Sequence, residues 1–311
     1  MRICVLGAGG LVGKTLLKVI KERKFFYKEI ILFGNKNEEI EINGERYFVE
    51  KFEGKIPDCD IFFSCLDKKE AKEIIPEIVR KGKRIIDNSP LFRLEKNIPL
   101  VIPEININEL NEKTLLIANP NCSTIQLILS ISPFLNYGIE RIFLSTYQSI
   151  SGAGKKGISA YECEKRGENY PESPFPYRIY ENLIPCIGEI KEGESEEERK
   201  IILESRKILK NEKIEIHPMC VRVPVPYVHS QSVFLILKKK IREEEAIEEI
   251  KRKDYLVYEE IPIPSNYKDK DIVGVGRIKI KNNILKFFTC MDNLRKGAAT
   301  NAVQIGEYYV R

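Results

Sequence analysis

Short apolar runs and amphipathic stretches alternate over the first part of the chain. The apolar runs predict buried strands over residues 2–6, 29–33, 60–65 and 83–87. Helical spacing of apolar positions predicts helices over 11–23 and 68–81 between these strands. Because strands and helices alternate in this way, the pattern predicts a parallel, doubly wound sheet.

Beyond residue 122 this alternation ends. Strands are predicted over 142–148, 219–225 and 272–280 and near Ile236, which suits a second sheet rich in antiparallel pairs. The polar, proline-rich stretch over 167–185 has the character of a loop, and residues 295–309 are predicted to form a helix.

Residues 194–211 also have helical periodicity. Ser195 with Glu198 is typical of a capping box at the start of a helix. The buried face is predicted to consist of Ile201, Ile202, Ile208 and Leu209. Charged side chains share the other face: Glu197, Lys200, Glu204 and Lys207. From periodicity alone, we expect that charged face to be exposed to solvent.

The composition narrows the classes of function. A chain of 311 residues is long enough for two domains, and its 51 basic and 46 acidic residues are mixed along the sequence. No basic block points to nucleic acid, no apolar run has membrane-spanning length, and the start MRICVLGAGG does not resemble a signal peptide. The eight scattered cysteines favour reduced thiols in a cytoplasm, and two histidines make a His-rich metal site unexpected.

A glycine-rich stretch, GAGGLVG, lies between the first predicted strand and helix. Glycines in this place allow the backbone to approach a pyrophosphate, which the helix N-terminus then holds. The residues expected to face a dinucleotide are Gly7, Gly9, Gly10, Leu11, Val12 and Gly13. An ordinary tight turn between strand and helix is the alternative.

The tip of the second predicted strand bears on cofactor choice. NAD-binding folds usually place an acidic residue there to hold the ribose hydroxyls. The tip has no acid, and Lys36 instead offers a cation suited to the 2′-phosphate of NADP. Glu38 and Glu39 follow closely, and a solvent-exposed loop lysine remains the alternative.

Cys122 lies directly behind Asn-Pro-Asn and ahead of an apolar run with helical spacing. Asn121 is a good N-cap, which places the thiol in the first turn of the predicted helix. Free N–H groups and the helix dipole there favour the thiolate, the form that acts as a nucleophile. A small buried apolar side chain is the alternative, since most free cysteines are of that kind.

Two further polar residues stand out in apolar surroundings. Arg222 lies in a strand-like stretch with Cys220 and Pro224 on its side, so it needs an anion or carboxylate partner, and a structural salt bridge would satisfy it equally. His229 follows in YVHSQS. A single histidine is more often structural than catalytic.

Several motifs occur together in one order: NPNCSTIQ, YQSISGAGKKG, CVRVPV, HS and DNLRKGAATNAVQI. Together with DNSPLFR and PLVIPEIN they closely resemble the bacterial branch of the aspartate-semialdehyde dehydrogenase family. The resemblance extends from the glycine loop to the last helix. It implies an α/β fold, with a Rossmann-type doubly wound sheet over residues 1–121 plus 293–311. An α+β catalytic and dimerisation domain would occupy residues 122–292.

The resemblance implies NADPH-dependent reductive dephosphorylation of β-aspartyl phosphate to aspartate semialdehyde. This is the branch step toward lysine, methionine, threonine and diaminopimelate. The family likeness implies a cytoplasmic homodimer or homotetramer, with NADP as cofactor and NAD possible.

Roles carry over motif by motif. Cys122 would be the nucleophile, His229 the acid and base, and Gln148 the residue that orients the acyl group. The implied substrate-binding residues are Arg222 for the carboxylate, Glu197 for the amino group, and Arg93, Asn121 and Lys200 for the phosphate. Glu204 with Lys207 is the alternative to Glu197 with Lys200. Further cofactor contacts are implied at Ser151, Gly152 and Asn293, beside the glycine loop and Lys36.

The chain departs from the family pattern in places. The family usually carries a serine–arginine pair for the 2′-phosphate, and this chain has Asn35-Lys36-Asn37. Gln231 stands where an acid often follows the HS motif. Two rival functions are another thioester-forming reductase, such as N-acetylglutamyl-phosphate reductase, and a non-catalytic homologue that binds dinucleotide. The first has a different cysteine motif, and the second would be expected to have lost Cys122 or His229.

Overall fold

The computed structural model describes residues 1–310 and divides into two compact units. The first unit is Met1–Asn121 together with the chain from Ala298 onward, and the second is Cys122–Gly297. The chain passes from one unit to the other immediately before Cys122 and again after Gly297.

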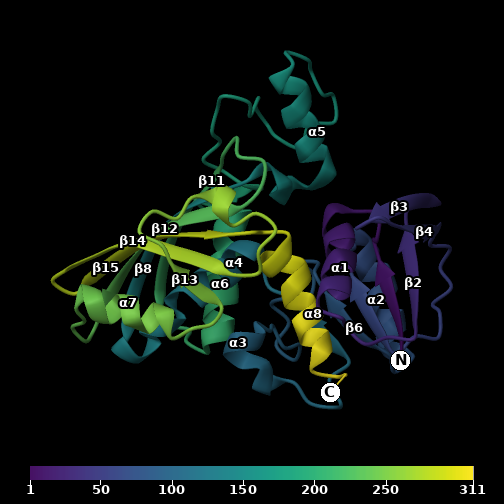
Figure 1. Ribbon diagram of the computed structural model, residues 1–311, viewed down its shortest axis with the longest axis horizontal. Coiled ribbons are helices and arrows are strands. Elements are labelled where there is room, and N and C mark those ends of the chain that lie inside the picture. The colour runs from purple at the N-terminus through teal and green to yellow at the C-terminus, as the bar shows by residue number, and fades with distance from the viewer. Residues whose placement is uncertain (311) are drawn as a thin grey trace. The chain divides into compact units, whose positions relative to one another are not determined.

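The first unit contains a seven-stranded sheet in the order β3-β4-β2-β1-β5-β6-β7. Its parallel strands are β1 (Arg2–Leu6), β2 (Glu29–Gly34), β5 (Ile61–Ser64), β6 (Arg84–Asp87) and β7 (Leu116–Ala118). Helices α1 (Leu11–Glu22) and α2 (Lys68–Arg80) join successive strands (Figure 1). The predicted doubly wound sheet is confirmed, since its apolar runs are buried on both sides.

A hairpin that the sequence analysis did not predict extends this sheet. Strands β3 (Glu38–Ile42) and β4 (Glu45–Lys51) are antiparallel, and β4 pairs with the end of β2. Asn43 and Gly44 connect them with φ of 51° and 81°. Two residues with positive φ form the tight turn that matches the twist of a hairpin, and Asn-Gly is its preferred sequence.

The second unit is built on a six-stranded sheet in the order β11-β8-β12-β15-β14-β13. Its strands are β8 (Ile139–Gln148), β11 (Glu215–Arg222), β12 (His229–Leu237), β13 (Leu256–Tyr258), β14 (Val273–Lys281) and β15 (Ile284–Met291). Most neighbours are antiparallel, as predicted, but β8 with β11 and β13 with β14 are parallel. The predicted strand over 219–225 in fact ends at Arg222, because Pro224 and Pro226 have no N–H to donate to a ladder.

Three helices pack against the sheet of the second unit: α4 (Cys122–Ile131), α6 (Glu196–Leu209) and α7 (Glu243–Lys251). The capping box of Ser195 and Glu198 at the start of α6 is confirmed. The expected solvent-exposed face of α6 is wrong in part, because Glu197 and Glu204 are 6% and 1% exposed. Since α6 contacts both β11 and α4, its buried face is wider than its apolar positions indicate.

The remaining elements are short or lie at the unit boundaries. They are α3 (Pro103–Asn106), α5 (Gly154–Lys165), α8 (Thr300–Glu307), strands β9 (Ile190–Lys191) and β10 (Glu194–Ser195), and the 3₁₀ helices Ile107–Glu109, Ser132–Tyr137, Ile150–Ala153 and Pro264–Asn266. The predicted C-terminal helix begins as a π-helix over Arg295–Ala299 before it continues as α8. No helix within residues 1–310 is both long and apolar enough to cross a membrane.

Candidate active site

The register of three strands brings Gln148, Arg222 and His229 to one edge of the sheet. Gln148 and Arg222 are paired at the ends of the parallel strands β8 and β11. His229 begins β12, which runs antiparallel to β8 from that same edge. The three side chains are all buried. Strand topology therefore gathers residues that are far apart in the sequence.

Two glutamines hold the start of α4 against this edge. The Nε2 of Gln231 donates to the carbonyl of Ser123 at 2.8 Å. The Nε2 of Gln126 donates to the carbonyls of His229 and Thr289 at 3.3 and 3.1 Å. The hydrogen bonds fix the first turn of α4, which Cys122 begins, at the start of β12.

His229 is fully buried, and its neighbours determine which ring nitrogen carries the proton. Nδ1 accepts a hydrogen bond from the backbone N–H of Ser149 at 3.0 Å. Because that N–H can only donate, the neutral ring carries its proton on Nε2. Among the residues that the structure describes, Nε2 has no hydrogen-bond partner. Burial, with a smaller contribution from the charge of Arg222, lowers the pKa of His229 well below 6.5.

A hydroxyl–amide network lies behind His229. The hydroxyl of Ser149 is 2.9 Å from Nδ1 of His229 and 3.0 Å from Oδ1 of Asn293. The hydroxyl of Ser151 and the N–H of Val228 also donate to that oxygen, at 3.1 and 3.2 Å. Ser151 and Asn293, which were predicted to contact the cofactor, are thus also connected to the imidazole.

Arg222 is 6% exposed, and its guanidinium lies close to His229. Nη1 donates to the carbonyl of Ser149 at 2.6 Å. Burial lowers the pKa of Arg222, and the negative charges of Glu197 and Cys122 oppose this effect. A Cβ on Gly152 would lie 2.7 Å from Nη1 and 3.1 Å from the His229 ring, so a side chain there would displace the guanidinium from its place beside the imidazole.

Glu197 belongs to the same cluster. Its Oε1 accepts a hydrogen bond from Nε2 of Gln148 at 3.2 Å. Nζ of Lys200 lies 3.6 Å from the other Glu197 oxygen and 2.9 Å from Glu196. The hydrogen bond to Gln148 favours Glu197 with Lys200 over Glu204 with Lys207 as the substrate pair.

The first unit holds the glycine loop and the other predicted phosphate contacts. Gly7 has φ of 77°, and a Cβ there would lie 2.6 Å from the carbonyl oxygen of Cys65. Gly13 packs directly on the backbone of Gly7 and Ala8. Gly10 is the N-cap of α1 and provides no side-chain cap, so the first-turn N–H groups suit an anion. The loop therefore has the shape that a dinucleotide pyrophosphate requires.

Arg93 and Asn121 also lie in the first unit and are buried. Nη2 of Arg93 donates to the carbonyl of Asn88 at 2.7 Å. The side chain of Asn119 donates to Oδ1 of Asn88 at 2.8 Å. Asn119 lies two residues before Asn121, the last residue of the first unit before the chain enters the second. The predicted phosphate contacts are thus divided, with Lys200 in the second unit.

Two family models match the chain: the NAD binding domain of semialdehyde dehydrogenase over residues 2–113, and the dimerisation domain of semialdehyde dehydrogenase over residues 131–296. Aspartate-semialdehyde dehydrogenase of Aquifex aeolicus is 36% identical over 334 aligned residues, covering 100% of this chain and 98% of that protein. Aspartate-semialdehyde dehydrogenase 2 of Vibrio cholerae is 37% identical, covering 99% and 97%. The chain belongs to the aspartate-semialdehyde dehydrogenase family.

Solved structures of this family agree. Aspartate semialdehyde dehydrogenase II from Vibrio cholerae, complexed with ASA, has a TM-score of 0.93 at 33% identity and covers 100% of this chain and 98% of that chain. The enzyme from Candida albicans with NADP has a TM-score of 0.75 at 22% identity, which shows the shared fold alone, and covers 98% and 97%.

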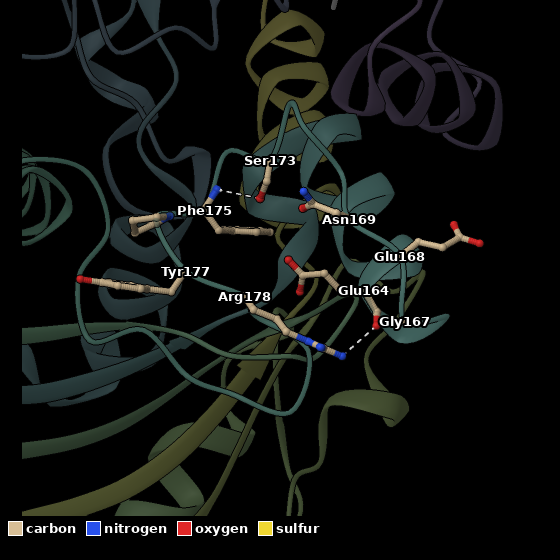
Figure 2. A pocket seen from close by; sticks show the side chains of 9 residues that line it. Glu164, Gly167, Glu168, Asn169, Ser173, Phe175, Tyr177 and Arg178 are labelled. Atoms are coloured by element: carbon tan, nitrogen blue, oxygen red, sulfur yellow. Dashed lines mark hydrogen bonds between the residues drawn. The ribbon is translucent and has the colours of Figure 1, made fainter.

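A cavity of about 370 Å³ lies in the segment that follows α5 (Figure 2). Phe175, Tyr177 and Arg178 line it, together with Glu164 from α5. The carboxylate of Glu164 accepts hydrogen bonds from the N–H groups of Ile179 and Tyr180, both at 2.8 Å, and so fixes the loop. The cavity is formed by this segment and includes none of the residues clustered around Cys122.

Local patterns in the sequence do not identify the residues that support this site, which are Ser149, Gln126 and Gln231. Gln231 departs from the family pattern, but that departure alone indicates no role. The available signal was a polar residue inside an apolar run, since Gln126 and Gln231 are both fully buried. A buried amide needs a partner, and here the partners are backbone carbonyls on neighbouring elements.

Proposed function

We propose that this protein catalyses the NADPH-dependent reductive dephosphorylation of β-aspartyl phosphate to aspartate semialdehyde. The reaction serves lysine, methionine, threonine and diaminopimelate biosynthesis. The observation that carries the proposal is the cluster of Gln148, Arg222 and His229 at the edge where α4 begins with Cys122. The relatives with full-length similarity carry the name of this activity.

Cys122 is the nucleophile in this proposal. Its sulfur attacks the acyl carbon of β-aspartyl phosphate, the carbon–oxygen bond to phosphate breaks, and a thioester forms on the enzyme. The helix N-terminus and the charge of Arg222 favour the thiolate. NADPH held at the glycine loop would supply the hydride for reduction of the thioester. The thiohemiacetal on Cys122 would then lose its hydroxyl proton to His229, and the Cys122 thiolate would leave to release the aldehyde.

His229 moves the protons. With its proton on Nε2, the ring donates a hydrogen bond to the oxygen that gains negative charge. To accept a proton at Nε2, the ring must carry one on Nδ1, and the backbone N–H of Ser149 must then give up its hydrogen bond to Nδ1. The hydroxyl of Ser149 lies 2.9 Å from Nδ1 and can accept from the protonated Nδ1, while it donates to Oδ1 of Asn293. The Ser149 hydroxyl therefore supplies the acceptor that this second protonation pattern requires.

Charged groups match the substrate at several points. The planar guanidinium of Arg222 suits the α-carboxylate in a bidentate contact, and Glu197 suits the amino group. Arg93, Asn121 and Lys200 would hold the phosphate group. Gln148, which is bonded to Glu197, orients the acyl group in this proposal.

The glycine loop and α1 would hold NADP(H), with its pyrophosphate at the N-terminus of α1. The contacts proposed here are Gly7, Gly9, Gly10, Leu11, Val12, Gly13 and Lys36 in the first unit, with Ser151, Gly152 and Asn293 in the second. All eight cysteines are free, in keeping with a cytoplasmic enzyme.

The assay that tests this function is phosphate-dependent oxidation of aspartate semialdehyde, run with NADP and with NAD. We expect turnover that requires phosphate, with N-acetylglutamate semialdehyde a poor substrate because Arg222 and Glu197 match a free amino acid. Preference for the N-acetylated substrate would instead support the rival reductase. A folded protein that binds dinucleotide and turns over neither substrate would support a non-catalytic homologue.

We also propose that the protein is a homo-oligomer, with a homodimer as its basic unit, and that the sheet of the second unit forms the interface. Helices α4, α6 and α7 contact this sheet. Phe143 on β8 is paired with Phe234 on β12 and with His217 on β11, so their side chains share one face. Phe143, Met219 and Phe234 are 41%, 52% and 40% exposed there. Phe143 also stacks on His217, with ring centroids 4.9 Å apart. An apolar patch of this kind is typical of an interface between subunits.

Replacing Phe143 with glutamate should separate the subunits, because a carboxylate would then have to lose its water in the interface. Light scattering at a fixed protein concentration should show half the wild-type mass. The matched control is Leu203→Glu, since Leu203 is 42% exposed on α6, away from this face. Equal masses for both variants and wild type would contradict the proposed interface.

A further inference from the structure

The hairpin of β3 and β4 places an acidic residue, Glu38, against the glycine loop. Strand β2 ends at Gly34, and β3 begins at Glu38 after a short turn. The turn is fixed, because Oδ1 of Asn37 accepts a hydrogen bond from the N–H of Lys51 at 2.7 Å. The N–H of Phe52 also donates to the carbonyl of Gly34 at 3.0 Å.

The carboxylate of Glu38 lies against Gly9. A Cβ on Gly9 would collide with Oε1 of Glu38, so the carboxylate occupies the surface of the glycine loop just before α1. The side chain of Glu38 is 21% exposed, whereas that of Lys36 is 69% exposed. Glu38 is therefore a charged residue that the fold places on this loop, within reach of a ligand bound there.

Lys36 does not cancel this charge. Its Nζ lies 3.7 Å from Oε2 of Glu38, so the ammonium is shared with a carboxylate. An exposed ion pair of this kind is weak and is screened by salt. A lysine engaged in such a pair attracts an incoming phosphate less than a free arginine would.

An acidic side chain in this position has a defined chemistry in dinucleotide-binding folds. It accepts hydrogen bonds from the hydroxyls of the adenosine ribose in NAD. A 2′-phosphate in the same place brings a second negative group against the carboxylate, and such like-charge contacts weaken binding. The position of Glu38 thus favours a ribose with a free 2′-hydroxyl.

We propose that Glu38 determines cofactor specificity, by accepting a hydrogen bond from the adenosine ribose and opposing the 2′-phosphate. The enzyme therefore accepts NAD(H) beside NADP(H) and discriminates weakly between them. The turnover part of this inference rests on the proposed function, but the binding part does not.

The test is isothermal titration calorimetry of the full chain with NADP⁺ and with NAD⁺. We expect the two dissociation constants of the wild type to differ by no more than about tenfold. Glu38→Gln should strengthen NADP⁺ binding by about tenfold and weaken NAD⁺ binding by a few-fold, because it removes one charge and keeps the shape. Lys36→Met should weaken NADP⁺ binding alone.

The matched control is Glu39→Gln, which makes the same charge change one residue along on the opposite side of β3, where Glu39 is exposed. Both dissociation constants should stay within about twofold of wild type. Glu38→Asp gives a second variant, in which the shorter carboxylate keeps the charge and loses reach, so NAD⁺ binding should weaken without a gain for NADP⁺.

The proposal is overturned if wild type prefers NADP⁺ by a hundredfold or more, or if Glu38→Gln changes both affinities alike. Failure of the proposed function has a different signature. Aspartate semialdehyde would then not be oxidised with either cofactor, while the shift in relative affinity between NADP⁺ and NAD⁺ on Glu38→Gln would persist.

Discussion

Cys122→Ser is expected to lower the phosphate-dependent oxidation of aspartate semialdehyde by at least about 10⁴-fold, because a serine hydroxyl at this site is a far weaker nucleophile than a thiolate. Substrate and cofactor contacts remain, so ligand binding should persist. Steady-state assay of kcat, with the melting temperature as a check on folding, measures the effect.

A matched control is Cys186→Ser, which makes the same change at a half-buried loop cysteine whose Sγ lies near the carbonyl of Gly188. Its kcat should stay within about twofold of wild type. Mass spectrometry adds an independent readout, since β-aspartyl phosphate without NADPH should leave an acyl adduct on the wild type alone. Appreciable turnover by Cys122→Ser, or an adduct on another cysteine, would refute the assignment of the nucleophile.

His229→Gln is expected to lower kcat by about 10²–10³-fold, the usual contribution of a positioned acid and base. Glutamine can still donate a hydrogen bond but cannot take up a proton. In the wild type the pKa of His229 lies well below 6.5, so the ring is neutral at neutral pH. Activity should fall only as the pH drops through that lowered value. A pH–rate profile checks this, and it should show no change caused by titration of His229 between about pH 6.5 and 8.

The same residue has a second readout in stability. In the unfolded chain the histidine has its ordinary pKa near 6.5, so below that pH the unfolded state binds a proton that the folded state does not. The free energy of unfolding should therefore decrease as the pH falls below about 6.5, and His229→Gln should reduce that slope. The control is His217→Gln, measured at protein concentrations where the variant has the same oligomeric mass as the wild type. A loss of wild-type activity in the pH–rate profile with a midpoint near pH 6.5 would contradict the buried, neutral ring.

Much of the fold followed from local patterns. Apolar runs alternating with amphipathic stretches gave the parallel strands of the first unit, because strands buried on both faces need continuous apolar runs. Ser195 and Glu198 marked the start of α6, because a capping box is made within one turn. The hairpin at Asn43-Gly44 has an equally local signal, because Asn-Gly is the preferred sequence of a two-residue turn.

The rest depended on contacts distant in sequence. Glu204 lies on the polar side of α6 by periodicity, yet it is buried, because α6 contacts both β11 and α4. The contact of Glu38 with Gly9 depends on the path of a whole hairpin. The partner of Gln231 is a carbonyl on another element. No spacing along one strand or helix can indicate such partners.

The bonds from Gln231 and Gln126 also bear on how steadily the nucleophile is held. Helix ends are normally the first parts of a helix to open, because their backbone groups have the fewest partners. Cys122 sits at such an end, but amide side chains bond its first turn to β12 and attach α4 to the start of that strand and to β15. End fraying is thereby opposed at the one turn where it would change the distance between thiol and imidazole.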